Sequence, residues 1–392
     1  MGLRTFGRLA PAALFLRAFG QILIVSFIPL QLANMGDRNY VVLGFIYGIP
    51  FFMQLLFAPV WGRLLDRVEL PGLFAAIGFL GYAAMEGGTA LFANPLGILL
   101  SLAIGGMFGA GLSPAAKWQA LRAADGHRTL ALALRAEAAG WLVGAALPSL
   151  FTALGSDVFR LLGFTAIASS LCALLFSRAA AAGAPDFALV QTSAAPRLRL
   201  PTHIWLLFLG TFLQFLLGET FYAFYGVYLT RFLGGPFWLY SASLVATTAL
   251  GLALYGLAAG TTHRHGAGRV LLGTSGVYTA SYGLLAIFPS VPMAAIVFSI
   301  PAFSFFRTAA TIGVAEAMPG RSGSAMGVLD AAEGLASSIG GPLSGLLIAH
   351  FSLGVLPILP LLLSALSALP LVLARRLHTP AAPEHAARQS TT

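Results

Sequence analysis

The sequence predicts an all-α membrane protein built from twelve membrane-spanning helices. Charged residues make up only 9% of the 392 residues, 58% are hydrophobic, and the mean hydropathy is +0.86. A water-soluble chain of this length needs far more charge to cover its surface, whereas a helical bundle in lipid can be as apolar outside as inside. The apolar residues also fall in runs of similar length, separated by short segments rich in glycine, proline and arginine.

A helix needs about 20 mostly apolar residues to cross the hydrocarbon core of a bilayer. Runs of this kind lie at 9–33, 40–61, 72–92, 95–117, 129–154, 158–178, 203–232, 237–259, 269–288, 292–317, 323–349 and 352–374. The first run has no small-residue cleavage pattern, so we expect a retained span and not a signal peptide. Turn signals separate runs at Pro71–Gly72, Asn94–Pro95, Gly234–Gly235–Pro236 and Pro289.

The basic residues predict the orientation. The chain has 22 lysines and arginines, and three of them lie within spans. Three more lie in segments on one side of the membrane: Arg38, Arg160 and Arg231. The other sixteen lie in segments on the opposite side. Because basic residues accumulate in cytoplasmic loops, we expect both termini in the cytoplasm. The net charge of +9 does not indicate nucleic-acid binding, since the basic residues are not gathered on one soluble face. We therefore expect a multi-pass protein of the cell membrane, in a bacterium the inner membrane.

The chain is expected to contain two related halves. Residues 1–178 form an N-terminal six-helix bundle, 179–201 a cytoplasmic linker rich in alanine and proline, 202–375 a C-terminal six-helix bundle, and 376–392 a disordered cytoplasmic tail. Nearly constant offsets pair residues of the two halves: Gly20-Gln21 with Gly218-Glu219, Gly140 with Gly334, and Pro148 with Pro342. Such a pattern indicates a duplicated six-helix unit, a plan that recurs among transporters.

The segment between the second and third spans reads Pro59-Val-Trp-Gly62-Arg63-Leu-Leu-Asp66-Arg67. A glycine permits a tight reversal, and a carboxylate at the membrane boundary can stabilise a neighbouring helix N-terminus. This segment resembles the cytoplasmic signature of the major facilitator superfamily. The resemblance implies two pseudo-symmetric six-helix bundles, with Gly62, Asp66 and Arg67 bracing a closed cytoplasmic gate. The sequence departs from the signature at Glu69–Gly72, and the counterpart at 260–265 has no acidic residue.

Span five carries Gly140, Gly144 and then Pro148. These residues resemble the glycine–proline motif of the superfamily's drug/proton antiporters. Close packing of helices through small residues explains them equally well. Glu137 shares their face and is therefore a candidate for the seam between the halves.

Ionisable residues within spans are costly and are candidates for function. Glu219 lies near the middle of span seven, with Phe212, Phe215 and Tyr222 on its face. The resemblance implies that spans one, four, seven and ten line a central cavity. A carboxyl there could exchange a proton near neutral pH, which makes Glu219 a proton-coupling candidate. The alternative is a structural glutamate hydrogen-bonded to a neighbouring helix.

Two arginines are candidates for a substrate cavity. Arg17 shares a face of span one with Gln21, and it either lies in the cavity or reaches the cytoplasmic interface by snorkelling. Arg307 lies too deep in span ten to snorkel. We expect it in the cavity, where it would pair with Glu219 or hold an anionic group of a substrate.

Three further carboxyl groups lie within spans. Asp330 and Glu333 share one face of span eleven with Ser337. If both carboxyls are buried, they favour holding one proton between them, which makes them proton-coupling candidates; a structural or gating role is the alternative. Glu86 in span three is expected near the outer interface, within reach of water.

The resemblance implies a secondary active transporter that works by alternating access. We expect proton-coupled efflux of lipophilic or amphipathic compounds. The aromatic residues around span seven suit a flat or lipophilic ligand and sugar stacking as well, so they do not name the substrate. The alternatives are a proton symporter that imports a sugar, nucleoside or organic anion, and a non-transporting sensor or scaffold. The expected partners are the lipid bilayer, a small-molecule substrate and protons, with no nucleic acid, and the expected oligomeric state is a monomer.

An enzyme is not expected. The histidines fall at or near predicted loops and span ends, no acidic or histidine cluster has metal-ligand spacing, and Cys172 is the only cysteine. No glycine-rich loop precedes a lysine in the pattern of a nucleotide-binding site. We therefore expect neither a cofactor nor a metal, and an ion gradient as the source of energy.

Overall fold

The computed structural model describes residues 3–36, 38–68, 70–92, 94–121, 126–155, 157–182, 202–317 and 322–377, and all regular structure within them is helical. The helices form twelve rods, at the places that the apolar runs predict. In chain order the elements are α1 (Leu3–Ile22), η1 (Leu23–Phe27), α2 (Ile28–Asn34), α3 (Tyr40–Val68), α4 (Pro71–Leu91), α5 (Pro95–Gly109), α6 (Leu112–Leu121), α7 (Gly126–Ala153), α8 (Val158–Ala182), α9 (Thr202–Val227), η2 (Tyr228–Phe232), α10 (Phe237–His265), α11 (Ala267–Ile287), α12 (Val291–Ser299), α13 (Ala302–Ala317), α14 (Ser322–His350), η3 (Leu353–Val355) and α15 (Ile358–Leu377).

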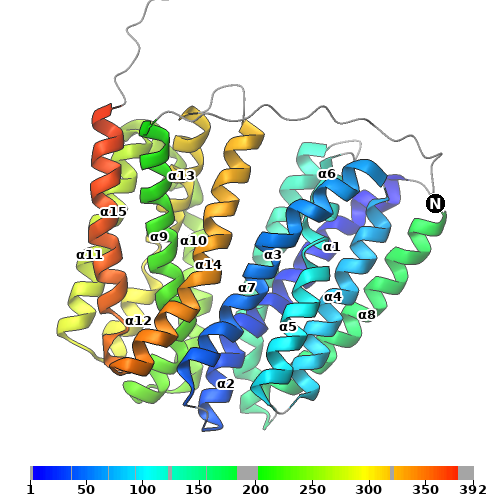
Figure 1. Ribbon diagram of the computed structural model, residues 1–392, viewed down its shortest axis with the longest axis horizontal. Helices are drawn as coiled ribbons and strands as arrows, with labels where there is room; N and C mark the ends of the chain where they lie inside the picture. The colour runs from blue at the N-terminus through cyan, green and yellow to red at the C-terminus, as the bar shows by residue number, and fades with distance from the viewer. Residues whose placement is uncertain are drawn as a thin grey trace, which may run out of the picture.

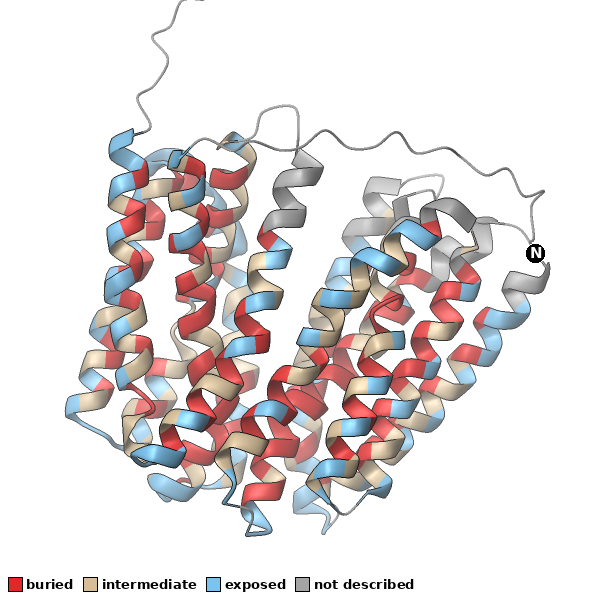
Figure 2. Cartoon of the chain, in the orientation of Figure 1, coloured by how far each residue is buried: buried red, intermediate tan, exposed pale blue. Residues whose placement is uncertain are grey.

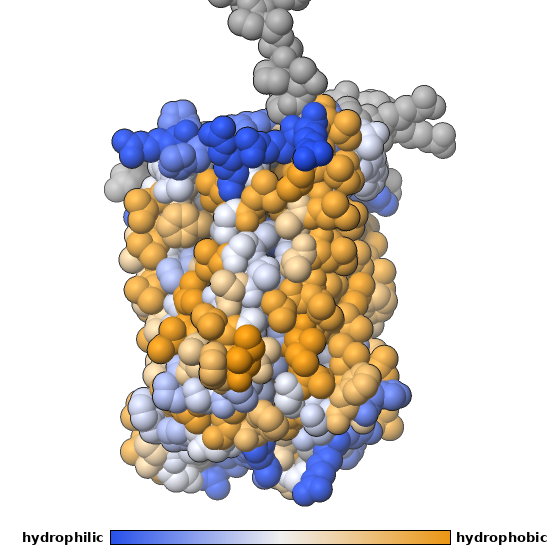
Figure 3. All heavy atoms as spheres, turned by 90° about the vertical axis from the view of Figure 1, so that its left-hand side faces the viewer, coloured by the Kyte–Doolittle hydropathy of each residue, from blue (hydrophilic) through white to orange (hydrophobic). Residues whose placement is uncertain are grey.

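The rods have the length and composition of membrane spans. Within the described residues, nine of them are long and apolar enough to cross a bilayer. The other three, α4, α7 and α14, carry acidic residues on faces that pack against other helices, which lowers their hydropathy. Figure 3 shows one side of the molecule, on which a hydrophobic belt separates two hydrophilic ends. The predicted all-α, polytopic membrane fold is confirmed.

The predicted turn signals mark real helix ends. Asn94 caps α5, because its side-chain oxygen accepts a hydrogen bond from the N–H of Gly97 at 2.7 Å, and Pro95 takes the first helical position. Gly234 adopts a φ of 75°, a left-handed conformation that glycine reaches without steric cost. The chain thus reverses where residues suited to reversal occur.

Five rods are less regular than the apolar runs predict. Spans one and seven each contain a π-helical turn, η1 and η2, spans four and ten are each broken into two helices, and span twelve begins with the 3₁₀ turn η3 before α15. The break in span ten has a clear cause: Pro301 cannot donate a backbone hydrogen bond, and Ile300 before it is extended, with a ψ of 121°. The irregularities of spans one, four, seven and ten occur in corresponding helices of the two halves, which supports the internal repeat.

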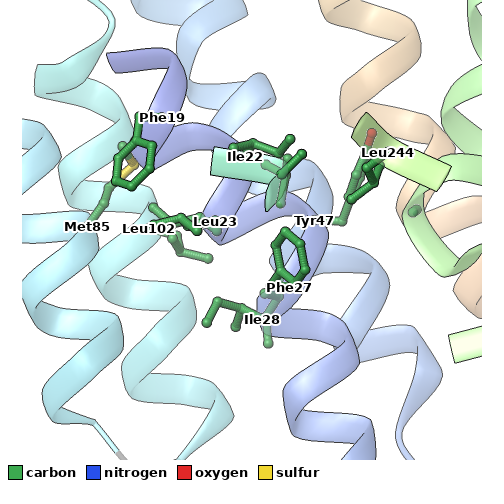
Figure 4. Close-up of a cluster of buried hydrophobic side chains, with 14 of the residues drawn as sticks. Phe19, Ile22, Leu23, Phe27, Ile28, Tyr47, Met85, Leu102 and Leu244 are labelled. Carbon is green, nitrogen blue, oxygen red and sulfur yellow. The ribbon is translucent and has the colours of Figure 1, made fainter. Parts of the chain in front are cut away.

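The twelve rods form two bundles, α1–α8 and α9–α15 (Figure 1). We call the end at which α1 begins and α15 ends the terminal face, and the other end the opposite face. The two bundles meet near the opposite face, through α3 with α14 and α7 with α10, and diverge toward the terminal face. Buried residues lie inside each bundle and where the bundles meet (Figure 2), and one apolar cluster joins α1 and α4 to Leu244 of α10 (Figure 4).

Glycines bring α3 and α14 into backbone contact at the seam between the bundles. A Cβ added at Gly44 would lie 2.4 Å from the carbonyl oxygen of Gly341, and one added at Gly345 would lie 2.1 Å from that of Tyr40. Gly140 and Gly144 do not lie at this seam, because they pack against Phe15 and Phe19 of α1 within the first bundle. The interpretation of the Glu137 face as part of the seam is therefore wrong.

Candidate functional site

A hydrogen bond between the two bundles ends on Glu219. The hydroxyl of Tyr47 on α3, a fully buried side chain, donates to Oε2 of Glu219 on α9, which is partly buried. Gly340 of α14 makes room for this arrangement, because a Cβ there would lie 2.7 Å from Cβ of Glu219. A protonatable carboxyl therefore lies directly at the contact between the halves.

One turn further along α9, Tyr222 makes a second contact between the bundles. Its hydroxyl lies 2.8 Å from Oγ of Ser26, and the hydroxyl of Tyr240 on α10 donates to the backbone carbonyl of Ser26 at 2.9 Å. Ser26 belongs to the π-helical turn η1, in which the backbone hydrogen bonds depart from the α-helical pattern. The apolar sequence 23–27 gave no signal of this turn, so Ser26 was not a sequence candidate.

A third polar contact closes the seam toward the opposite face. The guanidinium of Arg231 in η2 donates to the side-chain oxygen of Asn34 at 3.0 Å and to the carbonyl oxygen of Ala33. These bonds join the end of span seven to the end of span one. The described polar contacts between the bundles thus extend from Glu219 to the opposite face.

Arg307 lies in the second bundle between two carboxylates of α14. It forms an ion pair with Glu333, its guanidinium lies 3.8 Å from Oδ1 of Asp330, and it is 5.5 Å above the ring of Phe215. The expected pairing with Glu219 is therefore wrong for this conformation. Since 63% of the Asp330 side chain is exposed and an arginine lies between the carboxyls, the condition for a shared proton, burial of both groups, is not met.

The aromatic candidates on α9 differ in their surroundings. Phe215 is fully buried against Phe306 within the second bundle, whereas Phe212 and Tyr222 are partly buried. Gly218, four residues before Tyr222 on the same face, borders open space, since a Cβ there would meet no atom within 4 Å. The aromatic density around span seven is mostly core packing, and Tyr222 is the aromatic candidate that lies beside Glu219 at the seam.

Arg17 is held inside the first bundle and does not reach for an interface. It forms an ion pair with Glu137 of α7 and lies 3.4 Å from the side-chain oxygen of Gln54. Gln21, one turn later, is buried and accepts a hydrogen bond of 3.5 Å from Tyr82. Both residues therefore connect helices within one bundle.

The gate candidates lie near the terminal end of α3. The helix continues through Gly62 to Val68, so the tight reversal expected at Gly62 is not there; the chain turns after Val68, before Pro71. A Cβ at Gly62 would meet no atom within 4 Å. The side chains of Asp66 and Arg67 lie outside the described residues, and their role as a gate stays a prediction.

The expectation that Glu86 lies near the outer interface is wrong. Its side chain is fully buried between helices, not near the outer interface with access to water. Position along a span predicts depth in the membrane, but it does not show which neighbouring helices cover a side chain. Within the described residues, no group of three or more histidine, cysteine or acidic side chains is placed to hold a metal ion.

No protein-family model and no curated protein sequence matches the chain. Solved transporter structures do match it in fold. A bacterial homologue of the human lysosomal transporter Spinster, inward-facing and occupied, has a TM-score of 0.72 at 14% identity over 96% of this chain and 99% of its own. The nucleoside transporter NupG, in a mutant form, has a TM-score of 0.70 at 14% identity over 94% of this chain and 100% of its own.

The D-xylose–proton symporter has a TM-score of 0.69 at 16% identity, over 93% of this chain and 96% of its own. At these identities the likeness concerns the fold. These neighbours are transporters of the major facilitator superfamily, and the likeness extends over both bundles of the chain. The chain thus has the fold of the major facilitator superfamily.

Proposed function

We propose that this protein is a proton-coupled secondary transporter that works by alternating access. The observation that carries the proposal is the hydrogen bond from Tyr47 to Glu219, because it places a protonatable carboxyl at the contact between two bundles. Alternating access requires that this contact form and break once in each cycle. The transporter fold of the neighbours supports the same proposal.

The proton acts on this contact through charge. An ionised Glu219 accepts a charge-assisted hydrogen bond from Tyr47, which is about twice as strong as a neutral one. Protonation removes the charge and weakens the bond, so it favours separation of the bundles near the opposite face. Loss of the proton favours the arrangement described above, in which that side is closed.

The arrangement corresponds to an inward-facing state. The bundles diverge toward the terminal face, and the distribution of basic residues assigns that face to the cytoplasm. The likeness to an inward-facing Spinster homologue supports this assignment. In the outward-facing state, the contacts of Ser26 with Tyr222 and Tyr240 would be broken.

For the substrate, we propose lipophilic or amphipathic compounds, neutral or cationic, that are exported. Arg307 is already paired with Glu333 and Asp330, so together with Glu219 these four groups carry a net negative charge whether or not Glu219 is protonated. Such a set repels an organic anion and tolerates a cation. The partly buried ring of Tyr222 and the space beside Gly218 suit an apolar or aromatic part of the molecule.

Proton symport of a sugar or nucleoside is the second candidate. It is favoured by the fold likeness to a D-xylose–proton symporter and to a nucleoside transporter. The two candidates differ in the direction of proton flow. Addition of substrate to one side draws protons to the other side in symport and toward the substrate's side in antiport.

The test is transport in proteoliposomes with an imposed pH gradient and a panel of lipophilic cations, neutral sugars, nucleosides and organic anions. We expect uptake of a lipophilic cation driven by the pH gradient, with Glu219→Gln abolishing the gradient-driven component and preserving substrate exchange. Glu316→Gln is the matched control, because Glu316 is exposed at the end of α13. Gradient-driven transport that survives Glu219→Gln would exclude Glu219 as the coupling group.

A further inference from the structure

Glu86 is a buried carboxyl for which the proposed transport cycle so far has no use. It lies on α4, none of its side chain is exposed, and its Oε2 accepts a hydrogen bond of 2.8 Å from Ser169 of α8. Its other oxygen, Oε1, has no hydrogen-bond partner among the described residues. The hydroxyl of Thr165, one turn before Ser169 on α8, donates to the carbonyl of Leu162 and also lies near the Glu86 carboxyl.

Oε1 of Glu86 is covered by the backbone of α1. A Cβ added at Gly20 would lie 1.9 Å from this oxygen, so only a glycine leaves space for the carboxyl at this point. Water is therefore excluded from Oε1 by α1 itself. Any movement of α1 away from α4 would uncover the oxygen.

The charged groups around Glu86 do not neutralise it. On α1, Arg17 forms its ion pair with Glu137, and Glu86 has no ion pair among the described residues. Arg160 and Arg178 lie nine residues on either side of Ser169, about 13 Å away along α8. An ionised Glu86 would be a buried charge with one oxygen unbonded and no cation beside it, which is strongly unfavourable in a bilayer interior.

The remaining titratable neighbours are neutral groups. Tyr82, one turn before Glu86 on α4, is buried and donates to Gln21, and Cys172 on α8 is a free, partly buried thiol. Helix α5, which packs against α4, brings no titratable side chain, and α6 brings Lys117, which lies five residues beyond the contact of Leu112 with Gly78 and away from Glu86. The geometry points to a carboxyl that carries its own proton in this arrangement.

We propose that Glu86 is a second proton-binding site of the transporter, located within the first bundle, which holds its proton out of contact with water in the inward-facing arrangement and exchanges it with water when α1 moves away from α4. The release is a simple dissociation, in which the carboxylic acid gives its proton to water and becomes a carboxylate hydrogen-bonded by Ser169. That Glu86 holds a proton does not depend on the transport cycle proposed above; that it gives up the proton when α1 moves does rest on that cycle.

The structure supplies the link between α1 and that cycle. The π-helical turn η1 begins three residues after Gly20, and its Ser26 is bonded to Tyr222 and Tyr240 of the second bundle. When those bonds break, the part of α1 beyond Gly20 loses its anchor to the second bundle. Opening of the seam and exposure of Glu86 are then one movement of the same helix.

Infrared difference spectroscopy of the purified full-length protein in lipid tests the first step without any transport. We expect a carbonyl-stretch band of a protonated carboxyl at neutral pH that is lost in Glu86→Gln and retained in Glu219→Gln and Glu316→Gln. Absence of any difference between wild type and Glu86→Gln would overturn the proposal. If Glu86→Gln fails to fold, Gly20→Ala serves as the second variant, because the added methyl must displace the carboxyl and shift the band.

The second step is tested by the number of protons moved per substrate in proteoliposomes, with tetraphenylphosphonium as a lipophilic-cation probe or D-xylose as a sugar probe. We expect the proton-to-substrate ratio of Glu86→Gln to differ from the wild-type ratio, and Glu316→Gln to keep the wild-type ratio. An unchanged ratio in Glu86→Gln would overturn release during the cycle. If neither probe is transported, the proposed function fails for these compounds, and the infrared result still decides whether Glu86 binds a proton.

Discussion

At the scale of single residues, the site is organised by how close glycines let other groups approach. Gly20 admits the carboxyl of Glu86, and Gly340 admits Glu219, in both cases within a distance that a Cβ would forbid. Gly218 has the opposite surroundings, since an added Cβ would meet open space. The same residue type thus marks both the tightest contacts and the space beside the candidate proton site.

Gly20→Ala is expected to destabilise the protein, because the new methyl group would overlap with Oε1 of Glu86. Overpacking of this kind costs roughly 1–3 kcal/mol. Glu86→Ala in the same chain removes the obstructing group and should recover part of the loss. The thermal unfolding temperature of the two single variants and the double variant in detergent checks this; strictly additive losses would contradict the contact.

At the scale of helices, each bundle contains an arginine held by carboxylates. Arg17 connects α1 to α7 through Glu137, and Arg307 connects α13 to α14 through Glu333 and Asp330. The pairs lie within each half and not across the seam. They hold α1 to α7 and α13 to α14, so each of these pairs of helices is expected to move together.

Removal of one partner of the Arg17–Glu137 pair should be costly. Glu137→Gln leaves the guanidinium without its counter-ion at a site where the Arg17 side chain is 12% exposed, and breaking such a pair costs about 3–5 kcal/mol. Replacing both residues by apolar ones, Arg17→Met with Glu137→Leu, should be better tolerated than either single change. Thermal unfolding checks this, with exposed Arg160→Met as control; a double variant less stable than both single variants would contradict it.

The positions and ends of the helices could be predicted from the sequence, but which helices and side chains pack against each other could not. Proline and glycine mark chain reversals locally, so the ends at Pro71, Asn94 and Gly234 were predictable. The partner of Arg307 and the burial of Glu86 depend on which helices pack side by side, and helical spacing contains no such information. Likewise, nothing in an apolar run distinguishes a π-helical turn from an α-helix, so Ser26 could not be found.

At the scale of the whole molecule, two bundles meet along one seam and diverge at the other end. The backbone contacts of α3 with α14 and the polar bonds of Ser26, Tyr47 and Arg231 all lie on the closed side. The fold class and the two related halves were predictable from composition, charge and internal repeat. The conformation was not, because one sequence is compatible with more than one arrangement of the two bundles.

Gly345→Val is expected to shift the molecule toward the outward-facing state. A Cβ at this position would lie 2.1 Å from the carbonyl oxygen of Tyr40, so a larger side chain pushes the bundles apart on the closed side. A cysteine at Gly62, in a Cys172→Ser background, should then react several-fold more slowly with a water-soluble maleimide. Gly273→Val, where an added Cβ meets no atom, is the control. An unchanged rate in a stably folded Gly345→Val variant would contradict the shift.

The crossing of α3 and α14 has a mechanical consequence. Where Gly44 and Gly341 touch, neither backbone can come closer to the other, so the two helices can only move apart at this point. Opening of the closed side must therefore increase their separation here. Spectroscopic labels near Gly44 and Gly341 would report a longer distance in the other state, whereas labels at the terminal ends of the same two helices would report a shorter one.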